Sequence, residues 1–259
     1  LNAELETKDF EKLLSDKTKI VAVTHCSNIV GSTNNLKEIS ELAHKKNAIV
    51  IGDGVSYAPH GLPDVKSIGV DFYTFSLYKT YGPHLALLYG KSEILEKLPN
   101  QNHEFLEGDV PYTLNPGGPN HEELSCLVGV YEYFNNLFEH HFPSEDCSVR
   151  QKINKINELI ADHEKEIANP LLDYLNSRSD IRLIGRNRIE NKDRAPTIAF
   201  TMNNKSSKDL SSELVKYGIA TRNDNFYAWR CLNALGIDVD DGVVRTSMVH
   251  YNTQKDVEN

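Results

Sequence analysis

The sequence has few cysteines, and they lie far apart. Cys26, Cys126, Cys147 and Cys231 form no CxxC pair within the 259 residues. Structural zinc sites use closely spaced cysteine or histidine pairs, and disulfide frameworks are typical of short secreted chains, so neither is predicted. We expect free thiols in a reducing compartment, and therefore a cytoplasmic protein without a structural metal.

Long apolar runs and dense basic runs are also missing. No segment approaches the roughly 20 apolar residues that span a bilayer, and no signal-like segment opens the sequence. The formal net charge is −9, from 37 acidic and 28 basic residues. Because such a surface repels phosphate backbones, we expect neither a nucleic acid nor a membrane as partner. The sequence opens on Leu-Asn-Ala-Glu without an initiator Met, from which we expect a piece of a longer polypeptide.

The first half of the chain alternates short apolar segments with helix-like segments. Strands are predicted at residues 19–24, 48–51, 72–75 and 85–89, with a helix at 36–46. Alternation of this kind predicts an α/β fold whose mostly parallel sheet carries helices on both faces. We expect residues 1–140 to form this large domain.

The second half has a different pattern. Helices are predicted at residues 122–138, at 149–177 with a break near Pro170, and at 207–217, and strands at 197–202 and 243–250. This order predicts a smaller α+β domain over residues 141–259, including the connecting helix.

Three polar clusters follow predicted strands, at the strand ends where parallel sheets bind ligands. Thr24-His25-Cys26-Ser27-Asn28 follows the first strand, and a turn with Ser27 or Asn28 as a helix cap explains it equally simply. Asp53 follows the second strand. A carboxylate there suits the ring nitrogen of a pyridine cofactor, but a helix cap, a metal ligand or a ribose contact are alternatives.

Lys79 follows the third strand, in the segment FSLYKTYGP. A lysine that emerges from a buried strand loses hydration, which favours the neutral amine needed to form an imine. A lysine that extends to the surface is the alternative. Asp53 and Lys79 together suit a cofactor held at its ring nitrogen and at its aldehyde carbon. A phosphate-binding GxxxxGK[ST] loop and a GxGxxG dinucleotide motif are both missing.

These segments resemble a known family. THCSNIVG, IGDGVSYAPHG and FSLYKTYGP match its TH-x-SN-x-x-G, DG-x and FS-x-x-K-x-YGP motifs, in the same order. The likeness extends to RAPTIAF, FYAWRCLNALG and GVVRTSMVHYNTQKDV, and so covers nearly the whole chain. The sequence resembles the class V aminotransferases, which are pyridoxal 5′-phosphate (PLP) enzymes of fold type I, and in particular their cysteine-desulfurase-like branch.

The resemblance implies a role for several side chains. Lys79 would hold PLP as a Schiff base and move the α-proton of an amino-acid substrate. Asp53 would pair with the pyridine nitrogen, while Asn28, Ser56 and Ser76 would lie near the ring and the phosphate. Arg245 would bind the substrate carboxylate, with Arg222 nearby or merely on the surface. The resemblance also implies a homodimer whose sites border the interface.

Several departures leave the reaction open. Tyr227 stands where desulfurases carry the cysteine that accepts sulfur, and Cys231 lies about one helical turn further on. Tyr78 replaces a histidine, Ser56 a glutamine, and Gly118 a threonine that contacts phosphate. Transamination, lyase or desulfurase-type cleavage and racemisation all remain possible.

Family members also carry a long segment before this region, which supplies a phosphate-binding loop and a ring that stacks on PLP. A truncated, non-catalytic fragment that keeps the fold or a dimer interface is therefore an alternative. A nucleotide-binding or metal-binding domain that uses Asp53 and His60 is a third possibility.

Overall fold

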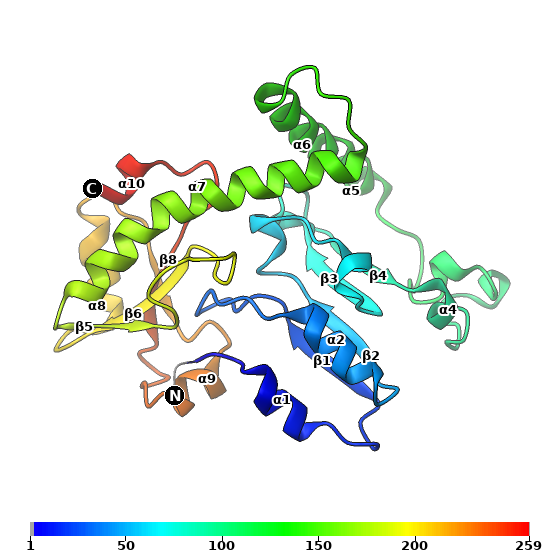
Figure 1. The fold of residues 1–259 in the computed structure, drawn as a ribbon, viewed down its shortest axis with the longest axis horizontal. Coiled ribbons are helices and arrows are strands. Elements are labelled where there is room, and N and C mark those ends of the chain that lie inside the picture. Colours follow the sequence, from blue (N-terminus) through cyan, green and yellow to red (C-terminus); the bar gives the residue numbers. More distant parts are fainter. Residues whose placement is uncertain (1–2, 259) are drawn as a thin grey trace.

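The computed structural model describes residues 3–258, which form two sheets connected by a long helix (Figure 1). The first sheet has the order β1-β2-β3-β4, with bounds Ile20–Thr24, Ile49–Asp53, Phe72–Ser76 and Ala86–Gly90. β1, β2 and β3 are parallel, and β4 is antiparallel to β3. The predicted mostly parallel sheet is thus confirmed. β4 reverses direction because residues 77–85 are too few for a parallel crossover.

Helices flank this sheet, and α2 (Leu36–His44) contributes most to its core. Asn35 caps α2 by accepting a hydrogen bond from the Glu38 amide. The side chains of Leu36 and Ile39 then pack into a core cluster with Val50 of β2. β1 is buried on one face only, since Val21 is 8% exposed and its neighbour Ile20 is 59% exposed.

The other helical segments of this half are short. They are α1 (Thr7–Leu13), η1 (Ala58–His60), α3 (Val65–Ile68), η2 (Leu77–Lys79), α4 (Ser92–Leu95), η3 (Glu104–Leu106) and η4 (Val110–Tyr112).

Asp71 anchors the start of β3. This carboxylate is 4% exposed and accepts hydrogen bonds from Lys91 Nζ at 2.7 Å and from the Val50 amide at 2.8 Å. His44 Nε2 lies 2.8 Å from Asp71 Oδ2, the oxygen that also accepts from the Val50 amide, while Lys91 donates to Oδ1. Because each buried oxygen has a partner, the charge remains in place and ties α2, β2 and the end of β4 together.

The region predicted as one helix at 122–138 is two, α5 (His121–Ser125) and α6 (Leu127–His141). The following helix, α7 (Val149–Ser177), passes through Pro170 without a break, so the predicted break is wrong. Pro170 lies on the exposed side, where water is available to the carbonyl that loses its partner. Buried Ile167 and Leu172 on either side hold both turns against the second sheet.

The second sheet has the order β5-β6-β8-β7 and is antiparallel throughout. Its strands are β5 (Ile181–Ile184), β6 (Thr197–Met202), β7 (Arg222–Asp224) and β8 (Val243–Ser247). The helices α8 (Ser207–Val215), α9 (Trp229–Ala234) and α10 (Gln254–Glu258) complete this half. The predicted α+β character is confirmed, although β5 and β7 were not predicted.

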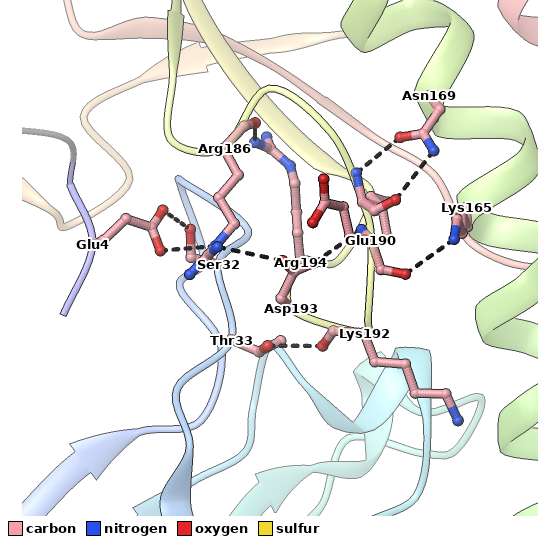
Figure 2. A network of polar contacts seen from close by, with 11 residues as sticks. Glu4, Ser32, Thr33, Lys165, Asn169, Arg186, Glu190, Lys192, Asp193 and Arg194 are labelled. Atoms are coloured by element: carbon pink, nitrogen blue, oxygen red, sulfur yellow. Dashed lines mark hydrogen bonds and ion pairs between the residues drawn. The ribbon is translucent and has the colours of Figure 1, made fainter. Parts of the chain in front are cut away.

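The turn after β1 joins the two halves of the molecule. Ile29 and Val30 of this turn pack in one core cluster with Ile184, Phe226 and Val243 of the second half. Figure 2 shows a polar network on the same junction, in which Glu4 contacts Ser32 and Arg186, and Arg194 donates to the Arg186 carbonyl. The first polar cluster is therefore fixed relative to the second sheet.

Within residues 3–258, no helix is both long enough and apolar enough to cross a bilayer.

Candidate functional site

The register of the parallel strands sets Asp53 in a row of strand ends. Thr24 of β1 pairs with Asp53 of β2, and Asp53 pairs with Thr74 of β3. β3 continues to Ser76, and η2 then ends at Lys79. Because parallel strands end at one edge of a sheet, Asp53 and the segment from Ser76 to Lys79 share that edge.

Asp53 and Lys79 are exposed there, so the expectation that both are buried is wrong. Asp53 is the last residue of β2, and Lys79 ends η2 directly after β3, so both lie where the chain leaves the sheet. Asp53 Oδ1 accepts a hydrogen bond from the Val55 amide at 3.0 Å. Lys79 Nζ lies 5.9 Å from the ring centroid of Tyr78, and it forms no ion pair with any residue between 3 and 258. Both groups are thus available to a ligand.

Ser56 and Ser76 are half-buried near the same edge. Ser76 precedes η2, and its side chain does not cap that helix. Its carbonyl accepts a hydrogen bond from Thr80 Oγ1 at 3.2 Å. The hydroxyl of Ser76 therefore has no role in ending β3.

A cluster of ring side chains, His25, Tyr57 and Tyr73, lies next to Asp53. The His25 amide donates to the Asp53 carbonyl at 2.7 Å. The His25 ring stacks on Tyr57 with 3.6 Å between centroids, and its Nδ1 lies 2.8 Å from the Tyr73 hydroxyl. Burial lowers the pKa of His25 to about 3, so the ring is neutral. A Cβ on Gly54 would lie 2.1 Å from the Tyr73 oxygen, so only glycine fits beside this cluster.

Arg245 lies at the junction of the two halves. Its Nη1 donates to the Asn28 carbonyl at 2.8 Å, and its guanidinium carbon lies 3.9 Å from the ring centroid of Phe226. Asn28 Nδ2 in turn donates to the Phe226 carbonyl at 2.8 Å. Burial and the nearby Arg222 charge lower the pKa of Arg245. The structure thus brings the predicted residues Asn28 and Arg245 into contact.

Arg222 pairs with Arg245 in the register of β7 and β8, but its side chain is exposed. Two like charges on neighbouring strands repel each other, which favours an anion between or beside them. The described residues form no ion pair with either arginine.

The residues at the expected sulfur-carrier position have no reactive thiol. Tyr227 is fully exposed, with a backbone φ of 62°. Cys231, in α9, is half-buried, and burial raises the pKa of its thiol. Cys26 is buried, and burial raises its pKa to about 12. Neither cysteine has the electropositive, exposed surroundings that stabilise a thiolate.

Sequence reasoning missed several residues that the fold brings together. Phe226 was not linked to Arg245, because α9 and the loop before β8 separate the two in the chain. His60 Nδ1 lies 2.9 Å from an oxygen of Glu164, which is 3% exposed on α7. A glutamate on the inward-facing side of the predicted helix at 149–177 was a usable signal, because a buried carboxylate needs a partner, which here is His60.

The set of side chains at the strand ends fits PLP. An amine, a carboxylate and a hydroxyl lie along one edge, at Lys79, Asp53 and Ser76, and Arg245 offers a cation for a carboxylate. No group of three His, Cys, Asp or Glu side chains within residues 3–258 is arranged to hold a metal ion.

Comparison with known proteins decides the family. The model of the family described as "Aminotransferase class-V" matches residues 2–136 and 150–259. The chain belongs to the class-V aminotransferase family. Among its relatives, the "Aminotransferase-like protein FGM3" of Gibberella zeae is 35% identical over an alignment of 262 positions, which covers 99% of this chain and 61% of that protein. A "Probable cysteine desulfurase" of Halalkalibacterium halodurans is 32% identical, over 98% of this chain and 59% of its own length.

Solved structures agree on the fold of this class-V chain. A crystal structure of the cysteine desulfurase CsdA of Escherichia coli superposes with a TM-score of 0.80 at 26% identity, over 99% of this chain and 61% of that one. The apo structure of a cysteine desulfurase of Thermococcus onnurineus gives a TM-score of 0.77 at 24% identity, with coverages of 99% and 61%. The predicted fold type is confirmed. The chain spans about 60% of the length of these relatives.

Proposed function

We propose that this class-V chain is part of a PLP-dependent enzyme that acts on an amino acid, with Lys79 as the point of covalent attachment of the cofactor. The observation that carries the proposal is the shared strand edge, on which neither Asp53 nor Lys79 has an ion-pair partner among the described residues. When bound, PLP supplies an electron sink for negative charge at the α-carbon of a substrate.

Each residue of the edge has a distinct proposed task. With PLP bound, the carboxylate of Asp53 would face the ring nitrogen and keep a proton there. Ser76 would donate its hydroxyl to the phosphate, and Ser56 and Asn28 would lie beside the ring. The amine of Lys79 would take up the α-proton of the substrate and return it. The Val55 amide bonded to Asp53 Oδ1 limits rotation of the carboxylate, so the remaining oxygen has a fixed direction.

The substrate carboxylate is assigned to Arg245, with Arg222 adding positive charge at longer range. Arg245 has no acidic partner among residues 3–258, which is the expected state of a group whose counterion is a ligand. The Asn28 carbonyl that accepts from Nη1 at 2.8 Å limits rotation of the guanidinium.

The reaction at the α-carbon is left unassigned among transamination, lyase or desulfurase-type cleavage and racemisation. The phenol of Tyr227 cannot form the persulfide that a cysteine forms at this position in desulfurases. Sulfur cleaved from a cysteine substrate would therefore leave as a free product. The absence of a reactive thiol at Cys231 supports the same conclusion. Product analysis with a panel of amino acids that includes cysteine separates these reactions.

We also propose two domains, residues 1–140 and 141–259, and a homodimer as the working form. The boundary lies one residue before the end of α6 and within residues 137–149, which the family model does not match. Sedimentation velocity measures the dimer directly.

Borohydride trapping tests the attachment site. The protein is incubated with PLP, reduced, digested and mapped by mass spectrometry, and the cofactor is expected on the peptide that contains Lys79. Lys66→Ala, which alters an exposed lysine of α3, is the matched control and should retain the label. Label on other lysines, or label that persists in Lys79→Ala, would refute the assignment.

A second candidate is a non-catalytic fragment that retains the family fold. The exposure of both Asp53 and Lys79 favours it, because water competes with a ligand for exposed groups. Equilibrium dialysis distinguishes the two: saturable PLP binding supports the enzyme, and its absence from folded protein supports the fragment.

A further inference from the structure

The guanidinium of Arg245 is held by an aromatic face, although no carboxylate among the described residues neutralises it. The Phe226 ring centroid lies 3.9 Å from the guanidinium carbon, well within the range of a cation–π contact. Arg245 Nε is buried and has no hydrogen-bond partner among residues 3–258. A cation in these surroundings depends on the ring for both its position and its electrostatic stabilisation.

The backbone that carries the ring is strained. Phe226 and Tyr227 have backbone φ angles of 51° and 62°, in the left-handed region that residues other than glycine rarely adopt. The strain is offset by fixed contacts: Asn225 Oδ1 accepts from the Tyr227 amide at 3.1 Å, and the Phe226 carbonyl accepts from Asn28 Nδ2. Strain of this kind persists when surrounding contacts determine the conformation, and here it places one ring on one cation.

Three separate segments thus meet around the guanidinium. Asn28 comes from the turn after β1, Phe226 from the loop after β7, and Arg245 from β8. Asn28 contacts both of the others, through its carbonyl and its amide nitrogen. The Phe226 ring is 8% exposed and packs in the cluster that joins the two halves, so its plane is fixed by the core.

We infer that Phe226 is a positioning residue, which holds the Arg245 guanidinium in one orientation so that its Nη2 end meets the carboxylate of an amino acid. The inference rests on the proposed carboxylate-binding role of Arg245. Asn28 fixes Nη1, and the ring blocks one face of the planar group. Rotation about the Nε–Cζ bond and swinging of the side chain are therefore both restricted.

NMR of protein labelled with ¹⁵N-arginine tests the positioning without cofactor or substrate. The Arg245 resonance is assigned by its loss in Arg245→Lys, and rotation about its Nε–Cζ bond is measured. We expect slow rotation in the original protein and in Phe226→Tyr, and at least severalfold faster rotation in Phe226→Leu. Phe134→Leu changes a buried phenylalanine of α6 and should leave the rate unchanged. Equal rates in Phe226→Leu and the original protein would overturn the inference.

Binding to the PLP-loaded protein tests the consequence for the carboxylate. Alanine, serine and cysteine are each compared with the matching amine that lacks the carboxylate, using calorimetric titration. We expect Phe226→Leu to reduce the preference for the amino acid about tenfold, with little change in affinity for the amine, and Phe226→Tyr to restore the preference. A uniform loss for both ligands would indicate a merely structural role and would reject the inference. If no amino acid binds the original protein while the NMR difference is present, the proposed function fails and the positioning of Arg245 stands.

Discussion

The buried imidazole of His25 makes the stability of this protein sensitive to moderate acid. Burial holds the pKa of His25 at about 3 in the folded state, against 6.5 for the free side chain. Between these values the unfolded chain binds the extra proton, so the free energy of unfolding falls as the pH decreases. The contribution is complete above about pH 6.5. At about 1.4 kcal/mol for each pH unit, lowering the pH from about 7.5 to about 4.5 removes about 2.7 kcal/mol.

Urea unfolding at these two pH values measures the loss, and His25→Gln isolates it. Glutamine does not titrate, and its amide is able to accept the hydrogen bond of the Tyr73 hydroxyl, which lies 2.8 Å from His25 Nδ1. The original protein should lose about 2.7 kcal/mol more than the variant between the two pH values. His103→Gln, at an exposed histidine, should behave as the original protein. An equal loss in the original protein and in His25→Gln would show that His25 is not held neutral in the folded state.

Three further predictions concern stability and cofactor binding. Gly54→Ala places a Cβ 2.1 Å from the buried Tyr73 oxygen and should lower the free energy of unfolding, measured in urea, by at least about 2 kcal/mol. Gly129→Ala on α6 is the control: its Cβ meets nothing within 4 Å, so it should raise the free energy of unfolding by about 0.5–1 kcal/mol in the same assay. Asp71→Ala leaves the half-buried Lys91 ammonium and the buried Val50 amide without their acceptor and should cost about 3 kcal/mol by thermal unfolding. Asp16→Ala removes only an exposed ion pair and should cost much less, and similar losses would contradict the role of burial. Asp53→Asn should weaken PLP binding at least about tenfold in equilibrium dialysis, and unchanged affinity would rule out its contact with the ring nitrogen.

The parallel strands and the polar residues that follow them could be predicted from the sequence. β1, β2 and β3 are short apolar runs separated by segments of helical period, a local pattern that leaves few alternative folds. The identity of the family also followed from local motifs, because the turns after these strands have characteristic residues at fixed spacing. The helix through Pro170 could not be predicted, since its continuity depends on Ile167 and Leu172 packing against a distant sheet.

The sequence by itself therefore determined the α/β character of the first half, the family and the set of candidate residues. Tertiary structure decided which of those residues meet. Asn28 and Arg245 lie 217 positions apart in the chain and are in contact, and Phe226 contacts both, because the turn after β1 packs into the core of the second sheet. Exposure was likewise decided in three dimensions: Asp53 and Lys79 follow buried strands, yet both face solvent where the chain leaves the sheet. Local patterns report the period of a strand, whereas contact and exposure depend on the packing of distant segments.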